Sequence, residues 1–214
     1  MKNYPLLEVR VSTPKLELRA STDELLDQLA EVVRAGKTHA EPAPYDDPMS
    51  FYETDPDLRV AKWLRAVWRR RGTVEPGAWR LNFAVMVDGQ PVGEQSITGV
   101  DFATLGTVTT FSWLSVDLRG RGLGREMRAA ILHLAFDGLG AKEAGSDAFV
   151  DNRGSNAISQ GLGYEPNGYE WATRQGEPAL LNRWRLTRDA WEKHRRDDIE
   201  LHNLEACHAL LPLT

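Results

Sequence analysis

Residues 119–125 read Arg119-Gly120-Arg121-Gly122-Leu123-Gly124-Arg125, and this short stretch decides how the rest of the chain is interpreted. Glycines at alternating positions let backbone N–H groups approach an anion closely. An apolar run ends near Val116 and a helical pattern begins near Leu123, so these groups lie at a helix N-terminus, which carries about half a positive charge. The surrounding arginines add to that charge. The stretch predicts a pyrophosphate-binding loop, while a tight structural turn remains the alternative.

Two common phosphate-binding patterns do not fit this stretch. The dinucleotide fingerprint G-x-G-x-x-G needs a different third spacing, and a Walker-type loop needs Gly-Lys followed by Ser or Thr. Here the glycines fall at 120, 122 and 124, and Arg125 follows the last of them. Neither a dinucleotide fold nor a P-loop nucleotide site is therefore expected.

Size and composition predict a cytoplasmic protein with one domain. The 214 residues, 42% of them hydrophobic, predict a single domain over 1–214, with a core at about 16–187 and a C-terminal helix and tail at 188–214. A net charge of -5 argues against nucleic-acid binding. No stretch approaches the ~18 apolar residues of a membrane span, and the start lacks the apolar segment of a secretory signal, so neither membrane insertion nor export is expected.

Cysteine and histidine usage predicts neither redox chemistry nor a metal site. Cys207 is the only cysteine, so it cannot form an internal disulfide, and packing is its expected role. His202 and His208 do not have the spacing of a zinc site.

Hydrophobic periodicity predicts a mixed α+β (α/β) architecture. Ser21 with Glu24 forms a capping box for a first helix, and a loop over 36–56 separates it from a second helix around Val60–Trp68. Further helices are expected over 123–138, over 154–162 and after Thr187. Strands are expected at 16–20, 79–87, 91–100, 107–116, 144–150, 169–175 and 179–186. The order predicts a mixed, mostly antiparallel sheet with helices on both faces.

Strands 107–116 and 144–150 should lie parallel, because a crossover helix joins them. The glycine-rich stretch then lies at their carboxyl edge, where ligands bind. Downstream, Asp151–Tyr164 reads DNRGSNAISQGLGY. The first stretch resembles the R/Q-x-x-G-x-G/A loop of GNAT acyltransferases. The second resembles the D/E-N-x-x-S…G-F/Y element of the branch that contains ribosomal-protein N-terminal acetyltransferases. The chain also resembles an actinobacterial branch to which succinyl transfer is assigned.

The resemblance implies a GNAT fold in which the parallel strands splay and the pantetheine arm of acyl-CoA lies between them. The cofactor-binding residues that it implies are Leu114, Ser115, Val116, Arg119, Gly120, Arg121, Gly122, Leu123, Gly124, Arg125, Asn152 and Ser155. The oxyanion donor would be the N–H of Leu114 or Ser115. Asn152 would bind CoA, with a turn-forming role as its alternative. Ser155 would hold or protonate the leaving thiolate, or bond only to backbone. Tyr164 is expected in the core.

The sequence contains several candidates for the general base. Where some relatives have a glutamate on the penultimate hairpin, this chain has Arg174, which cannot accept a proton at neutral pH. Glu170 is taken as the catalytic carboxylate, with Glu94 and Asp101 as further candidates and a water relay as another route. Arg174 or Arg80 would pair with the carboxylate of a succinyl group, a surface salt bridge being the alternative.

The sequence therefore predicts an N-acyltransferase that uses acetyl-CoA or succinyl-CoA and acts directly on a primary amine in a ternary complex. The amine would belong to a protein N-terminus, a lysine or a small molecule. A catalytically weak acyl-CoA-binding or regulatory module is the alternative. Loops 36–56 and 165–180 would choose the acceptor. Any exposed tryptophans could line the acceptor cleft or a homo-oligomer interface, although most are expected to pack in the core.

Overall fold

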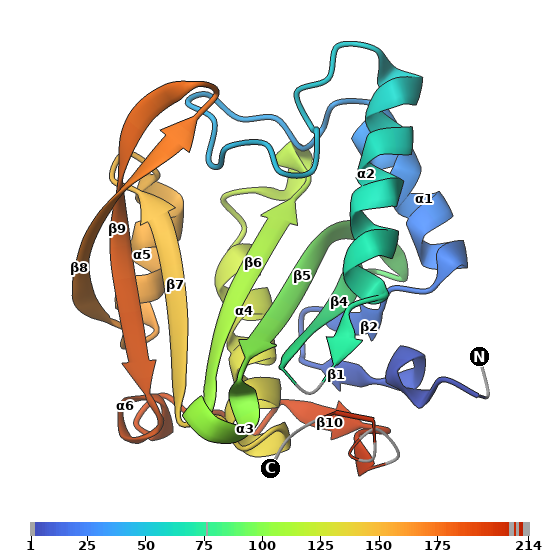
Figure 1. Cartoon of the computed structure of the whole chain (residues 1–214). Coiled ribbons are helices and arrows are strands. Elements are labelled where there is room, and N and C mark those ends of the chain that lie inside the picture. The colour runs from blue at the N-terminus through green and yellow to red at the C-terminus, as the bar shows by residue number, and fades with distance from the viewer. Residues whose placement is uncertain (1–2, 76, 206–207, 209, 212–214) are drawn as a thin grey trace.

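The computed structural model describes residues 3–75, 77–205, 208, 210 and 211, and it contains one ten-stranded sheet with helices on both faces (Figure 1). The strands follow the order β10-β1-β2-β4-β5-β6-β7-β9-β8, and β3 pairs with β4. The strands are β1 (Arg10–Ser12), β2 (Glu17–Ala20), β3 (Val74–Glu75), β4 (Ala78–Val87), β5 (Gln90–Val100), β6 (Thr107–Leu114), β7 (Glu143–Phe149), β8 (Glu165–Arg174), β9 (Glu177–Thr187) and β10 (Glu200–His202).

Helical segments connect these strands. They are η1 (Pro5–Glu8), α1 (Asp23–Arg34), α2 (Pro56–Arg71), α3 (Phe102–Leu105), η2 (Val116–Leu118), α4 (Leu123–His133), the π-helical turn η3 (Leu134–Gly138), α5 (Arg153–Gly161) and α6 (Arg188–Glu192). Every strand pair is antiparallel except β6 with β7, which is parallel. The predicted mixed, mostly antiparallel fold class is confirmed.

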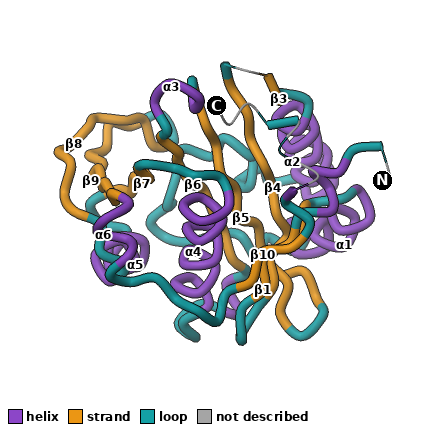
Figure 2. The backbone as a smooth tube through the Cα atoms, turned by 90° about the horizontal axis from the view of Figure 1, so that it is seen from below, coloured by secondary structure: helices purple, strands orange, loops and turns teal. Residues whose placement is uncertain are grey.

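The two faces of the sheet pack against different helices (Figure 2). On one face, α1 and α2 bury Leu29, Val33 and Trp63 against the strands, and Trp113 of β6 joins this cluster. On the other face, α4 packs through its apolar side against a larger cluster from β2, β4 and β5. Because side chains alternate along a strand, neighbouring residues of β4 and β6 supply both clusters.

The N-cap of helix α1 lies one residue later than predicted from the sequence. The capping residue is Thr22, whose hydroxyl accepts a hydrogen bond from Leu25 N, and Ser21 is buried outside the helix. The sequence Ser21-Thr22-Asp23-Glu24 contains several residues that can cap, so the pattern located the helix start but not the cap itself.

The shortest elements were not predicted. β1, β3, β10 and α3 have two to four residues, too few to show a periodicity. Trp63, Trp184 and Trp191 are buried as expected, whereas Trp68 and Trp171 are exposed. Cys207 lies outside the described residues. In the part of the chain that is described, no helix has both the length and the apolar character needed to cross a membrane.

Candidate active site

Strands β6 and β7 form a V that opens toward their carboxyl ends. They pair only where Thr107–Thr109 face Glu143–Gly145. Beyond these residues β6 continues to pair with β5 as far as Leu114, and β7 continues to pair with β9 as far as Phe149. Beyond the paired residues, β6 stays hydrogen-bonded to β5 and β7 stays hydrogen-bonded to β9, so the two strands diverge. The predicted splayed parallel pair is confirmed (Figure 1).

The glycine-rich stretch lies at the open end of the V, between η2 and the first turn of α4. Gly120 and Gly122 have φ values of 76° and 79°, and a Cβ atom at either position would meet nothing within 4 Å. Among the hydrogen bonds of the described residues, neither glycine N–H is a donor, so both are open to a ligand at a helix N-terminus. Gly124 has a different role, since a Cβ there would lie 3.1 Å from Ile158 Cδ1 of α5. It permits close contact between the two helices.

The arginines of the stretch have distinct environments. The Arg119 guanidinium donates to the carbonyl oxygens of Leu114, Thr38 and His39 at 3.1–3.2 Å, so it ties the end of β6 to the 36–56 loop. Arg125 donates to Gly161 O at 2.6 Å. Arg121 is exposed, and among the interactions of the described residues it has no partner.

Backbone hydrogen bonds indicate which N–H group faces the V. Ser115 N donates to Val92 O at 2.9 Å, and Val116 N donates to Lys37 O at 2.8 Å. Since successive N–H groups of a strand point to opposite sides, the N–H of Leu114 points away from β5 and toward the V. Of the two predicted oxyanion donors, Leu114 is therefore the one with its N–H directed to the ligand side.

Helix α5 starts on the other side of the V, at the end of β7. Asn152 is its N-cap, and its Oδ1 accepts a hydrogen bond from Ser155 N at 3.2 Å. This is the turn-forming role that the sequence left as the alternative to CoA binding. Ser155 is half-buried in the first turn, and among the described residues its hydroxyl makes no hydrogen bond. The helix N-terminus and this hydroxyl lie together at the carboxyl end of β7.

Asn156 was not predicted from the sequence, and it holds this helix in place. Its Nδ2 donates to Phe149 O and Asn152 O, and its Oδ1 accepts from Asn182 Nδ2 and Trp184 Nε1, all at 2.9 Å. A buried asparagine with all of these partners fixes β7, α5 and β9 relative to one another. The only signal in the sequence was a polar residue on the apolar side of a short helix.

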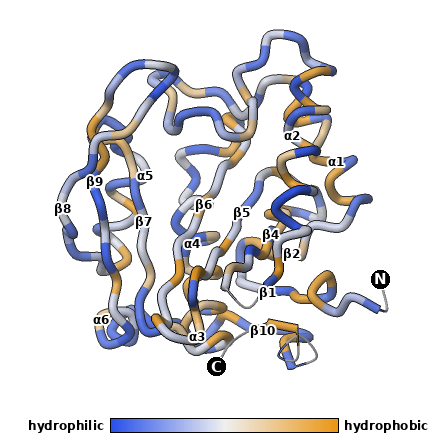
Figure 3. The backbone as a smooth tube through the Cα atoms, viewed as in Figure 1, coloured by the Kyte–Doolittle hydropathy of each residue, from blue (hydrophilic) through white to orange (hydrophobic). Residues whose placement is uncertain are grey.

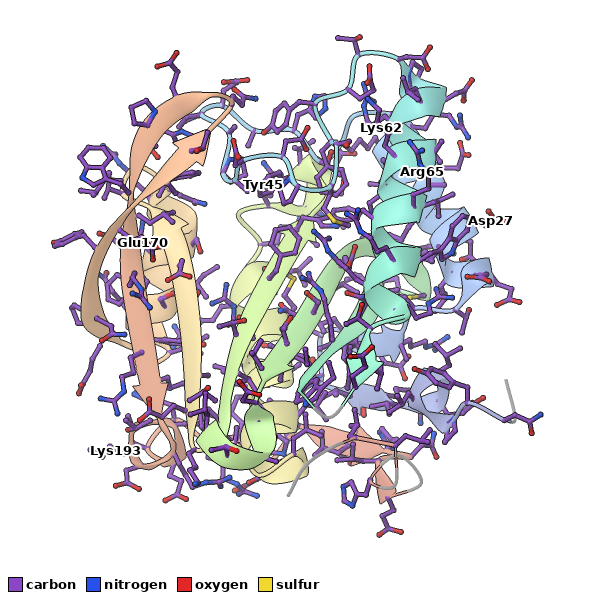
Figure 4. All side chains as sticks on the ribbon, viewed as in Figure 1. Asp27, Tyr45, Lys62, Arg65, Glu170 and Lys193 are labelled. Carbon is purple, nitrogen blue, oxygen red and sulfur yellow. The ribbon has the colours of Figure 1, made fainter. Side chains whose placement is uncertain are left out.

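The 36–56 loop spans the top of the V from β6 to the β8–β9 hairpin (Figure 1). At the hairpin, Arg174 pairs with both carboxylate oxygens of Asp151 at 2.9 Å, and its guanidinium lies over the Phe149 ring at 4.4 Å. Arg174 also donates to Ala43 O at 3.4 Å. The Arg174 hydrogen bonds hold the pKa of Asp151 below its usual value. Tyr45, labelled in Figure 4, extends from this loop, and its ring lies 5.7 Å from that of Phe111.

Two of the candidate bases, Glu170 and Asp101, lie apart from the V. Glu170 is 57% exposed on edge strand β8, which β9 separates from β7, and its Oε2 lies 3.6 Å from Arg183 Nε (Figure 4). Much of β8 is hydrophilic, in keeping with its position at the sheet edge (Figure 3). Asp101 follows β5 with a φ of 45° and precedes α3, at the opposite end of β6 from the glycine-rich stretch.

Glu94 is fully buried on the face covered by α2. Its Oε2 accepts from Trp113 Nε1 at 3.2 Å, and Trp63 also donates a hydrogen bond to this carboxyl. Burial raises the pKa of this carboxyl, and the nearby charge of Arg80 opposes the rise. Arg80 itself donates to Ser96 Oγ at 2.6 Å and to Asn82 Oδ1 at 3.1 Å, and burial lowers its pKa to about 10.

No group of three or more His, Cys, Asp or Glu side chains in the described ranges is arranged to hold a metal ion. The elements around the V are instead an open glycine-rich helix start, a strand-edge N–H and a second helix start with a hydroxyl. A family model described as an acetyltransferase (GNAT) domain matches residues 15–165, more than half of the chain. The chain belongs to the GNAT acetyltransferase family. The family expected from the sequence is thus confirmed, and the matched region contains both motifs.

Solved structures with the same GNAT fold support this assignment. RimJ from Mycobacterium smegmatis, in complex with CoA-disulfide, aligns with a TM-score of 0.70 at 19% identity, over 83% of this chain and 87% of that one. RimL, a ribosomal L7/L12 α-N-protein acetyltransferase in complex with coenzyme A, aligns with a TM-score of 0.63 at 19% identity, over 83% and 97%. The ribosomal-protein-S5-alanine acetyltransferase from Vibrio fischeri aligns with a TM-score of 0.65 at 14% identity, over 84% and 97%.

Proposed function

We propose that this GNAT protein transfers an acyl group, acetyl or succinyl, from a CoA thioester to a primary amine by direct attack in a ternary complex. The observation that supports the proposal most strongly is the pair of open, positive-φ glycines at the N-terminus of α4, at the wide end of the V. Structures that share the fold contain CoA or acetyl-CoA, which fits the same use of the loop.

In this proposal each part of the site has a separate task. The N–H groups of residues 120–124 bind the pyrophosphate, and the edge of β6 at 114–116 pairs with the pantetheine arm. The Leu114 N–H donates to the carbonyl oxygen of the thioester, where negative charge develops during attack by the amine. Ser155 gives its hydroxyl proton to the sulfur as the C–S bond breaks, so that a thiol leaves, and the proton that the attacking amine loses returns to Ser155 through water.

The acceptor would enter beneath the 36–56 loop. Arg119 holds this loop at residues 38 and 39, Arg174 holds it at Ala43, and the ring of Tyr45 lies 5.7 Å from that of Phe111. RimL, which shares the fold, is named as an α-N-protein acetyltransferase, so a protein N-terminus is the first class of amine to test, followed by lysine and small amines.

A catalytically weak acyl-CoA-binding module is the second candidate, and one observation favours it. The three carboxylates considered as bases are buried, paired with an arginine, or at the far end of the sheet. Such a protein would keep the CoA loop while lacking a group to deprotonate the amine.

Measurement of thiol release separates the two candidates. Purified protein is mixed with acetyl-CoA or succinyl-CoA and a panel of N-terminal peptides, lysine peptides and small amines, and products are identified by mass spectrometry. The proposed function requires amine-dependent thiol release with at least one acceptor. Binding of CoA without transfer to any amine would contradict it and support the module.

Replacing Ser155 with alanine is expected to lower kcat by about 100-fold, because general acid assistance to a leaving group is worth at least that much. The dissociation constant for CoA should change by no more than about twofold, because the N–H of residue 155 still donates to the capping side chain of Asn152. Ser155→Thr keeps a hydroxyl and is the matched control. A normal kcat in Ser155→Ala would exclude Ser155 as the acid.

A further inference from the structure

Helix α4 contains a buried arginine that the proposed reaction does not use. Arg128 is 5% exposed, and its Nη1 donates to Ser146 Oγ of β7 at 2.8 Å. Its Nε is buried with no hydrogen-bond partner, and among the described residues no acidic side chain pairs with the guanidinium. Burial of a cation without a carboxylate is costly, so the position calls for a functional reason.

The groups around Arg128 are hydroxyls rather than carboxylates. Ser146 Oγ accepts from its guanidinium, and the Tyr164 hydroxyl forms side-chain hydrogen bonds with Arg128 and with Thr110 of β6. Burial raises the pKa of Tyr164, and the nearby charge of Arg128 opposes the rise without reversing it, so the phenol keeps its proton. A buried cation whose Nε–H has no acceptor, beside hydroxyls that can also donate, forms a suitable environment for one carboxylate.

These groups lie at the narrow end of the V. The last paired residues of the two strands are Thr109 and Gly145, and Thr110 and Ser146 come directly after them. The Leu114 N–H lies further along β6 toward the wide end. An arm that enters from residues 119–125 and pairs with 116 and then 114 would point its acyl group down the strand, toward Arg128.

We propose that Arg128 binds the terminal carboxylate of a dicarboxylic acyl group carried by CoA, with Thr110 and Tyr164 as further donors. The inference rests on the proposed function, because it requires acyl-CoA in the V. It favours Arg128 over Arg80 and Arg174 for this role. Arg174 is already paired with Asp151, and Arg80 lies near the Glu94 carboxylate, on the face covered by α2.

Calorimetry without an amine acceptor tests the proposal. Acetyl-, malonyl-, succinyl- and glutaryl-CoA are titrated into the wild-type protein and into Arg128→Met. We expect the wild type to bind at least one dicarboxylic donor about 10- to 100-fold more tightly than acetyl-CoA, and Arg128→Met to lose that preference while keeping its affinity for acetyl-CoA. A wild type without a preference, or a preference that survives in Arg128→Met, would overturn the proposal.

Further variants keep the test decisive. Arg80→Met should retain the preference, and its loss there with retention in Arg128→Met would assign the carboxylate to Arg80 instead. Methionine is apolar and of similar length, so Arg128→Met should melt at or above the wild-type temperature. If it does not fold, Thr110→Val is titrated in its place, and an unchanged preference would count against the proposal. Because no amine is present, failure of acyl transfer in the thiol assay would not affect this result.

Discussion

Replacing Gly122 with valine is expected to weaken the binding of CoA by about 100-fold or more while leaving the fold intact. Gly122 has a φ of 79° and caps α4, a conformation that a β-branched residue adopts only with strain of about 1–3 kcal/mol. A valine side chain would extend into the open space from which an anion approaches the loop. A tenfold change in a dissociation constant corresponds to about 1.4 kcal/mol. Loss of two N–H contacts to a charged phosphate group therefore accounts for binding of CoA that is about 100-fold weaker.

Gly140→Val is the matched control for this prediction. Gly140 also has a positive φ, 74°, and a Cβ there would likewise meet nothing within 4 Å, but it lies between η3 and β7. The two variants should lose similar stability in urea unfolding, whereas only Gly122→Val should lose affinity for CoA in calorimetry. Equal affinities for CoA in the two variants would mean that residues 119–125 form a structural turn.

The central part of the fold could be predicted because its signals are local. The spacing of Gly120, Gly122 and Gly124 indicates a tight glycine-rich loop at a helix start. The apolar residues before and after it indicate a strand and a crossover helix. A parallel arrangement of 107–116 and 144–150 follows from that connection alone. Each inference needed only residues close together in the chain.

The rest of the site depends on contacts between distant segments. Arg119 was predicted as a ligand of CoA, and its guanidinium also binds the carbonyl oxygens of residues 38 and 39, which no pattern around Arg119 indicates. The register of the β8–β9 hairpin places Arg174 against Asp151 and leaves Glu170 on an exposed edge. Arg128 reads in the sequence as an ordinary helix residue, and only the packing of β6, β7 and α5 shows that it is buried.

Replacing Asn156 with leucine is expected to destabilise the protein by about 3–5 kcal/mol and to abolish acyl transfer. The change leaves two donors, Trp184 Nε1 and Asn182 Nδ2, and two acceptors, Phe149 O and Asn152 O, without their partner. A buried polar group left unsatisfied costs about 1–3 kcal/mol, and leucine has the same branched arrangement of heavy atoms as asparagine, so lost hydrogen bonds rather than a cavity dominate.

Asn182→Ala is the graded control, because it removes one of those four hydrogen bonds from a half-buried side chain and should cost about 1 kcal/mol. Both free energies of unfolding are to be measured by urea unfolding, followed by circular dichroism. Because Asn156 positions the start of α5, Asn156→Leu should lose activity even below its melting temperature, through displacement of Asn152 and Ser155. Asn156→Leu with a free energy of unfolding within 1 kcal/mol of the wild type would show that α5 is held mainly by its apolar contacts, and the Ser155 hydroxyl would then need another means of being fixed beside the sulfur.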